Sequence, residues 1–156
     1  MSKVYLSVRD IVEASQVLAE KIATRLPPSE MKGLVAILNG GVFPAYWLRK
    51  IFTKNGMECP LETIDVRSYE GYSKQGELKI LRQPEGLGDG KGWVFVDEIA
   101  DTGKTLEALK KLYPAALFVS LSAKPRGLEI TDLNALSFAQ EDWIVFPWEI
   151  LEDEVA

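Results

Sequence analysis

The sequence predicts an α/β fold, a mostly parallel, twisted β-sheet flanked by helices. Short continuous apolar runs, typical of buried parallel strands, alternate along the chain with segments whose apolar residues recur at helical spacing. The length of 156 residues suits one domain. No repeat, low-complexity tract or linker divides residues 1–156. We therefore expect a single domain whose ligand sites follow the carboxyl ends of the strands.

The first third of the chain predicts two helices around one strand. Ser7, followed three residues later by Asp10, is placed to cap a helix that ends before two consecutive prolines. Leu34–Leu38 is an apolar run that ends in a glycine-rich turn, which indicates a buried strand. A second helix is expected at about Phe43–Lys54, where Pro44 is tolerated because it falls in the first turn.

The rest of the chain predicts a hairpin and then alternating strands and helices. Leu61–Tyr69 has strand character, and a polar, glycine-punctuated stretch separates it from the apolar residues Leu78–Leu81. This pattern predicts a mobile β-hairpin, or flap, at about residues 68–82. Further strands are expected at residues 93–96, 116–123 and 143–146, with a helix at residues 105–113.

The composition excludes several classes of function. The 18 Lys and Arg residues against 23 Asp and Glu give a net charge of −5, whereas nucleic-acid binding needs excess basic residues. No apolar stretch approaches the ~18 residues of a membrane span, and the N-terminus lacks a signal-peptide core. The single cysteine, Cys59, suits a reducing compartment, so we expect the cytoplasm. The absence of histidine excludes Ser-His-Asp and Cys-His catalysis and most zinc sites.

Residues Val94–Thr105, with the sequence VFVDEIADTGKT, carry the strongest functional signal. An apolar strand leads into Asp97 and Glu98, Asp101 follows, and a Thr-Gly-Lys-Thr turn opens a helix. Free backbone N–H groups and the positive end of the helix dipole make such a turn suitable for phosphate. Paired carboxylates beside it suit sugar hydroxyls or a metal ion. Taken singly, each acid is explained equally well as a helix cap or a solvated side chain as by such a role.

Two other phosphate-binding motifs are excluded. Gly103, Lys104 and Thr105 match the end of a P-loop, but Glu98 stands where that motif requires its first glycine. The pair Gly88 and Gly90 precedes a strand, whereas the glycines of a dinucleotide-binding fingerprint open a helix.

The run from Asp97 to Thr105 resembles the signature of the type I phosphoribosyltransferase family, which holds the ribose 5-phosphate of phosphoribosyl pyrophosphate. Residues 37–41 resemble the pyrophosphate loop of that family, and the hairpin resembles the flap that closes over its site. Residues 121–127 and 142–149 resemble the purine-binding segments of the xanthine-guanine phosphoribosyltransferases of bacteria. The resemblance implies transfer of ribose 5-phosphate to N9 of a 6-oxopurine (guanine, xanthine or hypoxanthine) with release of pyrophosphate, in nucleotide salvage.

The resemblance also implies roles within the signature. Asp97 and Glu98 would bind the ribose 2′- and 3′-hydroxyls, with Glu98 near Mg²⁺, although relatives commonly carry Asp at this second position. Asp101 would face purine N7 as the general base or acid; the alternative is a helix-capping carboxylate. Residues 100–105 would hold the 5′-phosphate. The other substrate-binding residues expected in this loop are Ile99, Ala100, Thr102, Gly103, Lys104 and Thr105.

The resemblance implies that two further segments bind the substrate. The backbone amides of Asn39, Gly40 and Gly41 would contact pyrophosphate, at a turn where glycine permits a close approach. The alternative for these residues is an ordinary tight turn between a strand and a helix. Ser68 and Tyr69 would contact substrate from the flap.

The C-terminal third would bind the base. Lys124 would donate to O6, which favours 6-oxopurines because an amino group there cannot accept from an ammonium; the alternative is a surface lysine. Trp143 would stack on the purine and the carbonyl of Ile144 would contact its 2-substituent, although either residue could be core. Glu149 would hold a second Mg²⁺, and a solvated acid is the alternative.

The resemblance implies Mg²⁺ as cofactor and a homodimer or homotetramer as assembly. The expected ligands are phosphoribosyl pyrophosphate, a purine base, pyrophosphate and the nucleoside monophosphate. One alternative is a regulatory protein that binds phosphoribosyl pyrophosphate without transferase activity; it should show a basic face or an added DNA-binding domain. A pyrimidine-type transferase is a second alternative, and Lys124 and Trp143 argue against it.

Overall fold

The computed structural model of the chain describes residues 2–68 and 78–149. A six-stranded sheet forms its centre, with the order β4-β3-β2-β5-β6-β7. Only the pair of β3 and β4 is antiparallel, so the predicted mostly parallel sheet is confirmed. The strands are β2 (Gly33–Leu38), β3 (Leu61–Ser68), β4 (Leu78–Arg82), β5 (Trp93–Ala100), β6 (Leu117–Ala123) and β7 (Leu133–Ser137).

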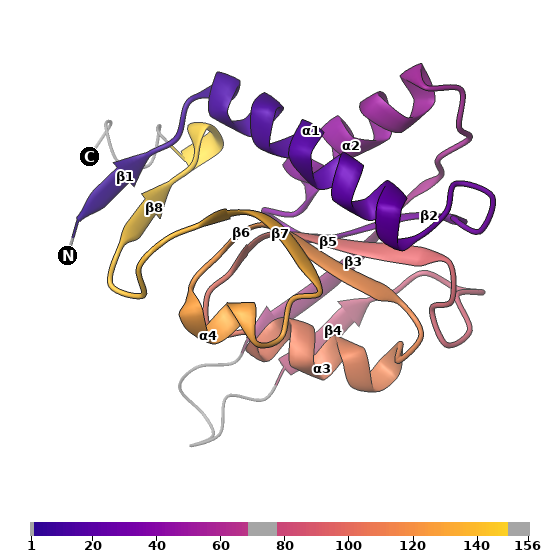
Figure 1. Cartoon of the computed structure of the whole chain (residues 1–156). Coiled ribbons are helices and arrows are strands. Elements are labelled where there is room, and N and C mark those ends of the chain that lie inside the picture. The colour runs from indigo at the N-terminus through magenta and orange to yellow at the C-terminus, as the bar shows by residue number, and fades with distance from the viewer. Residues whose placement is uncertain (1, 69–77, 150–156) are drawn as a thin grey trace.

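Helices cover both faces of this sheet (Figure 1). One face carries α1 (Val8–Arg25) and α2 (Val42–Lys54), and the other carries α3 (Lys104–Leu112) and the short α4 (Pro125–Leu128). The predicted cap of α1 is confirmed, because Ser7 Oγ accepts from the Asp10 backbone and Asp10 accepts in return from the Ser7 backbone. None of the helices in the described ranges is long and apolar enough to cross a membrane.

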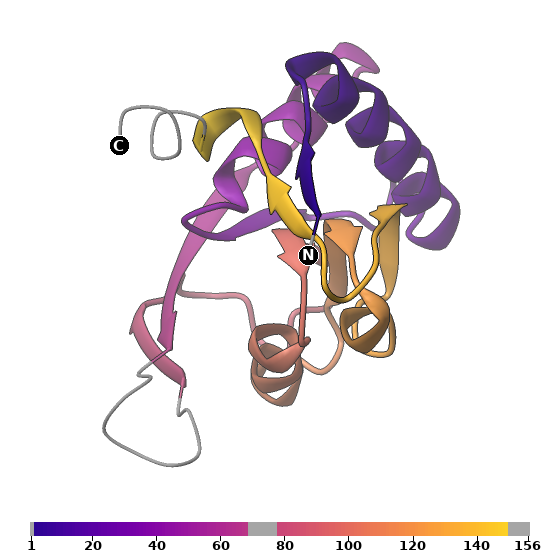
Figure 2. The ribbon, with the colours of Figure 1, turned by 90° about the vertical axis from the view of Figure 1, so that its left-hand side faces the viewer.

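A second, two-stranded sheet joins the two ends of the chain (Figure 2). In it β1 (Lys3–Tyr5) pairs in parallel with β8 (Trp143–Val145), and the 3₁₀ helix η1 (Pro147–Glu149) follows β8. The sequence analysis predicted β8 but not β1, β7, α4 or η1. Each of these missed elements is only three to five residues long, too short for apolar periodicity to reveal it.

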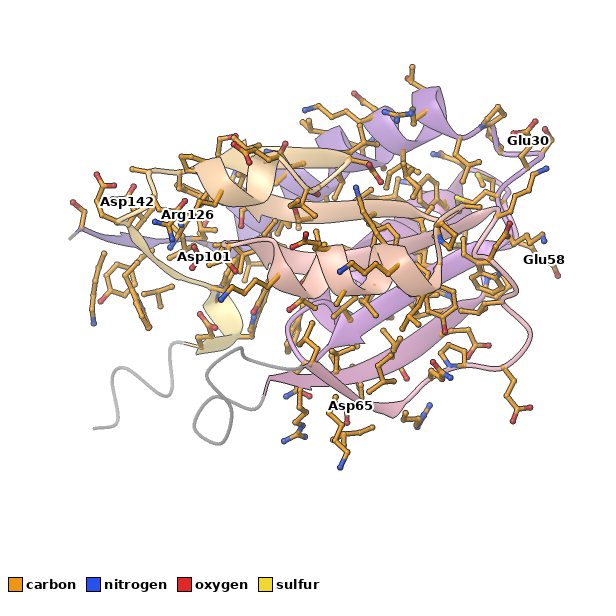
Figure 3. All side chains as sticks on the ribbon, turned by 90° about the horizontal axis from the view of Figure 1, so that it is seen from below. Glu30, Glu58, Asp65, Asp101, Arg126 and Asp142 are labelled. Carbon is orange, nitrogen blue, oxygen red and sulfur yellow. The ribbon has the colours of Figure 1, made fainter. Side chains whose placement is uncertain are left out.

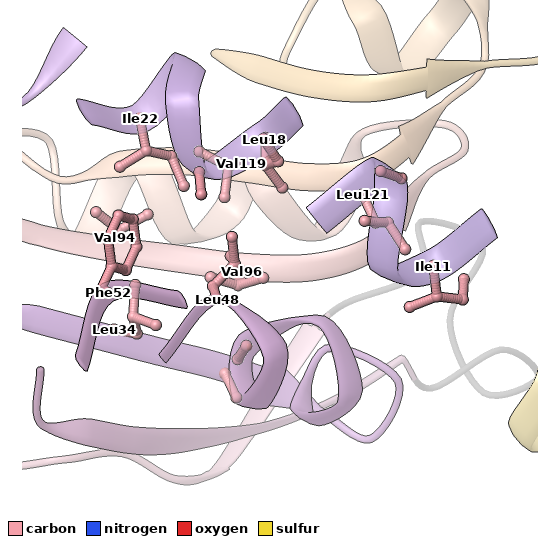
Figure 4. Packing of buried hydrophobic residues seen from close by; sticks show 14 of the residues in the cluster. Ile11, Leu18, Ile22, Leu34, Leu48, Phe52, Val94, Val96, Val119 and Leu121 are labelled. Atoms are coloured by element: carbon pink, nitrogen blue, oxygen red, sulfur yellow. The ribbon is translucent and has the colours of Figure 1, made fainter. Parts of the chain in front are cut away.

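Two apolar clusters hold the sheet between its helices. Val94 and Val96 of β5 face α1 and α2, where they lie among Ile11, Leu18 and other fully buried side chains (Figure 4). Phe95, between them, belongs to the opposite cluster beneath α3. This alternation is the two-residue period of a strand.

Two parts of the structure bear on the expected loops. Strand β5 continues four residues beyond the predicted end at Val96, so Asp97 and Glu98 lie within a strand and not in a loop. The antiparallel pairing of β3 with β4 forms the two arms of the predicted hairpin, with Ser68 opposite Leu78. The tip of that hairpin, including Tyr69, lies outside the described residues.

Candidate active site

The candidate site lies where β2, β5 and β6 end beside one another. These three strands are neighbours and run parallel, so their carboxyl ends open on the same edge of the sheet. The loop at Asn39 follows β2, the loop at Asp101 follows β5, and Lys124 follows β6. The structure therefore brings together the three segments that the sequence singled out.

Asp97 and Glu98 point to opposite faces of the sheet. Asp97 lines a pocket on the side of α3, and its Oδ1 accepts from the backbone N–H of Glu98 at 2.8 Å. Glu98 lies on the α2 side, where its Oε2 accepts from Nε1 of Trp148 at 2.8 Å. A Cβ built at Gly40 would lie 2.0 Å from the carboxyl carbon of Glu98. Because β5 continues through these two residues, their side chains alternate, and the two adjacent acids lie on opposite sides of the sheet.

Burial raises the pKa of both carboxyls. The pKa of Asp97 rises from its usual 3.8 to about 7 because the group is desolvated, an effect that the hydrogen bond from the Glu98 backbone only partly offsets. Burial also raises the pKa of Glu98 to about 7, and the negative charges of Asp97 and Glu149 add to this effect. The hydrogen bond from Trp148 acts in the other direction. A cation or a hydroxyl donor bound beside these buried carboxyls would stabilise their ionised form.

The turn after β5 forms a small pocket at the N-terminus of α3. Its volume is about 100 Å³, smaller than the roughly 300–1,000 Å³ typical of pockets for whole small molecules, which suits a single phosphate group. Gly103 adopts a left-handed conformation with φ of 80°, and a Cβ there would lie 2.7 Å from Ile130. Gly103, the N-cap residue of α3, has no side chain to cap the helix, and the Lys104 N–H makes only a long hydrogen bond of 3.5 Å to the Thr102 hydroxyl. The first turn of α3 can therefore still donate to a ligand. The pocket is lined by Asp97, Ile99, Ala100, Asp101, Thr102, Gly103, Lys104, Thr105 and Leu106.

Asp101 is held by two side chains from other elements. Nζ of Lys124 lies 3.2 Å from its Oδ2, and Nε2 of Gln140 lies 2.7 Å from its Oδ1. The Lys124 side chain is only 9% exposed, so the alternative of a surface lysine is wrong. Asp101 does not cap α3, so the capping alternative is wrong as well. The Asp101 side chain is still 49% exposed, so a ligand can reach it.

The turn after β2 packs tightly on β5. A Cβ at Gly41 would lie 2.3 Å from the carbonyl oxygen of Val96, and the Cβ of a residue at position 40 would meet Glu98. Gly41 leads directly into α2, and the peptide bond between Leu38 and Asn39 is cis. Asn39 itself is exposed. The glycines are therefore required for the contact between this turn and the neighbouring strand.

The predicted base-binding residues lie in and around the small second sheet. Trp143 is 55% exposed, so it is not a core residue, whereas Ile144 beside it is buried. Glu149 accepts from the backbone N–H of Phe146 at 3.1 Å, and its charge acts on Glu98. The indole of Trp148 stacks between two rings, with centroids 4.5 Å from Phe43 and 4.9 Å from Phe146.

Two residues of the site were missed by the sequence analysis. Gln140 contacts Asp101 and Trp148 contacts Glu98, each from a segment far along the chain. No local motif marks Gln140, because its partner is 39 positions away. Trp148 lies inside the predicted purine-binding segment 142–149, and its indole N–H donates to Glu98, an acid of the signature.

The carboxylates fit Mg²⁺ carried by a substrate. Hard carboxylate oxygens are suitable ligands, and no salt bridge neutralises Asp97 or Glu98 within residues 2–68 and 78–149. In the same ranges no three His, Cys, Asp or Glu side chains are grouped to cage a metal. Mg²⁺ commonly binds through one or two carboxylates and the substrate's phosphates, and this donor set matches that mode.

Larger grooves lie away from these residues. One of about 620 Å³ runs between α1 and the start of β7, lined by residues such as Val17, Lys21 and Leu133. In it Lys21 donates to the carbonyl of Asn134, and Asp132 is paired with Lys110. It is larger than the pocket at the start of α3, but none of the acids Asp97, Glu98 and Asp101 lines it. We therefore place the chemistry at the strand ends.

Comparison with known proteins agrees with this placement. The family model described as the phosphoribosyl transferase domain matches residues 8–154. A purine phosphoribosyltransferase from Pyrococcus horikoshii is 30% identical, with a TM-score of 0.77 over 95% of this chain and 94% of that one. The xanthine-guanine-hypoxanthine phosphoribosyltransferase of Helicobacter pylori is 26% identical, with a TM-score of 0.74 over 98% and 97%.

A Neisseria gonorrhoeae protein solved with bound ppGpp shares the fold, at 24% identity and a TM-score of 0.74 over 95% of this chain and 89% of that one. The family model covers most of this chain, and the Pyrococcus enzyme matches it nearly end to end. The chain therefore belongs to the type I phosphoribosyltransferase family, close to the xanthine-guanine enzymes, and is a pentosyltransferase.

Proposed function

We propose that this enzyme transfers ribose 5-phosphate from phosphoribosyl pyrophosphate to N9 of a 6-oxopurine and releases pyrophosphate. The observation that carries this proposal is the buried Lys124, which follows β6 and lies 3.2 Å from Asp101 at the mouth of the site. An ammonium fixed at this place donates to a carbonyl oxygen such as purine O6, and cannot accept from the amino group of adenine. The purine activities named for the Pyrococcus and Helicobacter relatives support the same choice.

The chain's own residues bind and orient the sugar phosphate. The 5′-phosphate occupies the pocket at the start of α3 and accepts from its backbone N–H groups. Asp97 and Glu98 accept from the ribose hydroxyls and stabilise the positive charge that develops on the ring as pyrophosphate leaves. Asn39, Gly40 and Gly41 hold the pyrophosphate with backbone amides. Glu98 would hold one Mg²⁺ and Glu149 a second, and these ions would supply positive charge for the pyrophosphate.

The base is held on the other side of the sugar. Trp143 stacks on the purine with its exposed face, and the carbonyl of Ile144 accepts from the 2-substituent. Asp101 faces N7 and exchanges a proton with it as the general base or acid. Alignment of the base with the sugar is the main contribution of these residues, since the reaction needs both reactants in line. Ser68 and Tyr69 contact the substrate from the hairpin.

Pyrophosphate release tests this function. Phosphoribosyl pyrophosphate and Mg²⁺ are supplied with guanine, xanthine, hypoxanthine, adenine or uracil in separate reactions. We expect release with at least one 6-oxopurine, none with uracil, and loss of at least about 100-fold in Asp101→Asn, which keeps the shape but cannot exchange the proton. Binding of phosphoribosyl pyrophosphate, measured by calorimetry, should persist in that variant.

The same assay separates the alternatives. Tight binding of phosphoribosyl pyrophosphate without release for any base would favour a regulatory protein that has kept the site and lost the chemistry. Release with uracil alone would favour a pyrimidine transferase.

We further propose a role in nucleotide salvage in the cytoplasm, as a homodimer or homotetramer. The thiol of Cys59 is buried, and burial raises its pKa to about 11, which suits a reducing compartment.

A further inference from the structure

The carboxylate of Asp101 has a second partner besides Lys124, and that partner is Gln140. Its Nε2 donates to Oδ1 of Asp101 at 2.7 Å, shorter than the 3.2 Å contact between Lys124 and Oδ2. A hydrogen bond to an ionised acceptor is short and comparatively strong. Each of the two carboxylate oxygens is therefore held by one donor.

The orientation of the Gln140 amide is fixed by a second, independent contact. Its Oε1 accepts from the backbone N–H of Arg126 at 3.1 Å. Arg126 lies in the first turn of α4, where backbone N–H groups have no acceptor within the helix. Because the amide oxygen is occupied there, the amide nitrogen must face Asp101. Figure 3 shows Asp101 and Arg126, the two residues that Gln140 contacts, close together at the same end of the molecule.

The loop that carries Gln140 is anchored to the site at both ends. The backbone N–H of Phe138 donates to the carbonyl of Ala123 at 3.1 Å, one residue before Lys124. Asp142 closes the following turn, because its side chain accepts from Ala139 and its backbone N–H donates to the Ala139 carbonyl, both at 3.2 Å. Trp143, the proposed stacking residue, comes next. The loop thus connects the region of Lys124 with Trp143, and Gln140 lies in its turn.

We infer that Gln140 is a positioning residue for the transfer reaction: it fixes the rotation of the Asp101 carboxylate, so that this group meets purine N7 in one orientation. Lys124 alone cannot do this, because a single donor to one oxygen leaves the carboxylate free to turn about its Cβ–Cγ bond. Two donors on the two oxygens remove that freedom. In this role Gln140 acts through Asp101, the side chain to which it donates. The inference rests on the role proposed above for Asp101.

Two substitutions separate positioning from a purely structural role. Gln140→Glu keeps an oxygen acceptor for Arg126 and replaces the donor toward Asp101 with a repelling oxygen. Gln140→Met has a similar length and removes both contacts. Gln83→Leu is the matched control, since Gln83 makes one side-chain hydrogen bond, to Tyr113 at 3.3 Å, outside the site.

Steady-state kinetics with the full chain, Mg²⁺, phosphoribosyl pyrophosphate and the preferred base give the readout. We expect Gln140→Glu to lower kcat by about 10- to 100-fold, at least as much as Gln140→Met. The KM for phosphoribosyl pyrophosphate should stay within about twofold in both variants, because the phosphate pocket is untouched. Gln83→Leu should keep its kcat.

The outcomes distinguish this inference from the proposed function. Near-normal kcat in Gln140→Glu together with a loss in Gln140→Met would show that Gln140 only fastens its loop to α4, and would overturn the inference. Near-normal kcat in both variants would overturn it as well. An inactive wild-type enzyme with every purine would instead overturn the proposed function, and the role of Gln140 with it. If Gln140→Met fails to fold, Gln140→Glu still decides, because it retains the contact with Arg126.

Discussion

The indole Nε1 of Trp148 donates a 2.8 Å hydrogen bond to Oε2 of Glu98, although the two residues are 50 positions apart in the sequence. The same indole is stacked between Phe43 of α2 and Phe146. One side chain therefore joins the segment after β8 to the end of β5 and to α2, the helix that follows the loop at Asn39. This contact ties the C-terminal segment to the strand ends that form the candidate site.

Replacing Trp148 with Phe should weaken the fold through this one bond. The smaller ring still stacks on its neighbours, but the N–H donor is lost, and we expect the free energy of unfolding to fall by about 1 to 2 kcal/mol. The pKa of Glu98 should rise further, because this hydrogen bond lowers it. Urea denaturation measures the effect, with Trp47→Phe on α2 as the control for ring size. Equal losses in the two variants would show that the bond contributes nothing.

The stability of the ligand-free enzyme should fall as the pH rises. The pKa of Asp97 is raised from 3.8, and that of Glu98 from 4.5, each to about 7. Between about pH 4 and pH 7 the folded chain keeps protons that the unfolded chain has released, so the unfolding free energy declines through this range and stays low above it. We expect a higher Tm at pH 5 than at pH 8 without Mg²⁺. The Asp97→Asn variant should show a shallower decline, and an unchanged slope there would contradict the assignment.

Gly40→Ala should disturb Glu98 directly. The added Cβ would lie 2.0 Å from the Glu98 carboxyl carbon, so the carboxyl must move away, and we expect a loss of about 1 to 3 kcal/mol in unfolding free energy. The double variant Gly40→Ala/Glu98→Ala removes the obstacle. In the Glu98→Ala background, therefore, the same glycine substitution should cost much less, as a thermodynamic cycle measured by chemical denaturation will show. Additive costs would mean that the strain lies in the backbone of the turn.

Lys124→Met should remove the preference for 6-oxopurines. The variant loses a charged donor, and we expect kcat/KM with the preferred base to fall by about 10- to 150-fold. Lys110→Met is the matched control, because Lys110 pairs with Asp132 at 3.0 Å and lies outside the site. It should lower the Tm and leave kcat/KM unchanged. An equal kinetic loss in the control would show that Lys124 acts only through stability.

The sequence predicted the frame of the site because its signals are local. A phosphate-binding turn is encoded by consecutive residues, and the order of apolar runs and helices is enough to place Asn39, Asp101 and Lys124 at one edge of a parallel sheet. The predicted end of β5 at Val96 was wrong, because acidic residues usually mark the point where a strand leaves the core. Here Asp97 and Glu98 continue the strand, and their burial within it raises the pKa of each carboxyl to about 7.

The contacts that orient the acids could not be predicted in the same way. Gln140 and Trp148 reach their partners only after the whole chain has folded, and neither stands in a pattern that differs from ordinary surface or core residues. Gly127 is similar: a Cβ there would lie 1.8 Å from the carbonyl oxygen of Ala100, a restriction that exists only once α4 has docked against β5. The tip of the hairpin, including Tyr69, lies outside the described residues, so its expected contacts stay predictions.

The pairing of β1 with β8 sets an order of events during synthesis. Residues 3–5 are synthesised before the six strands of the central sheet, and their partners, residues 143–145, are synthesised after them. The central sheet can therefore form before β1 and β8 pair. The two-stranded sheet then forms last. A nascent chain stopped before Trp143 would contain Asp101 and Lys124 but neither Trp143 nor Ile144, the two residues of β8 proposed to contact the base.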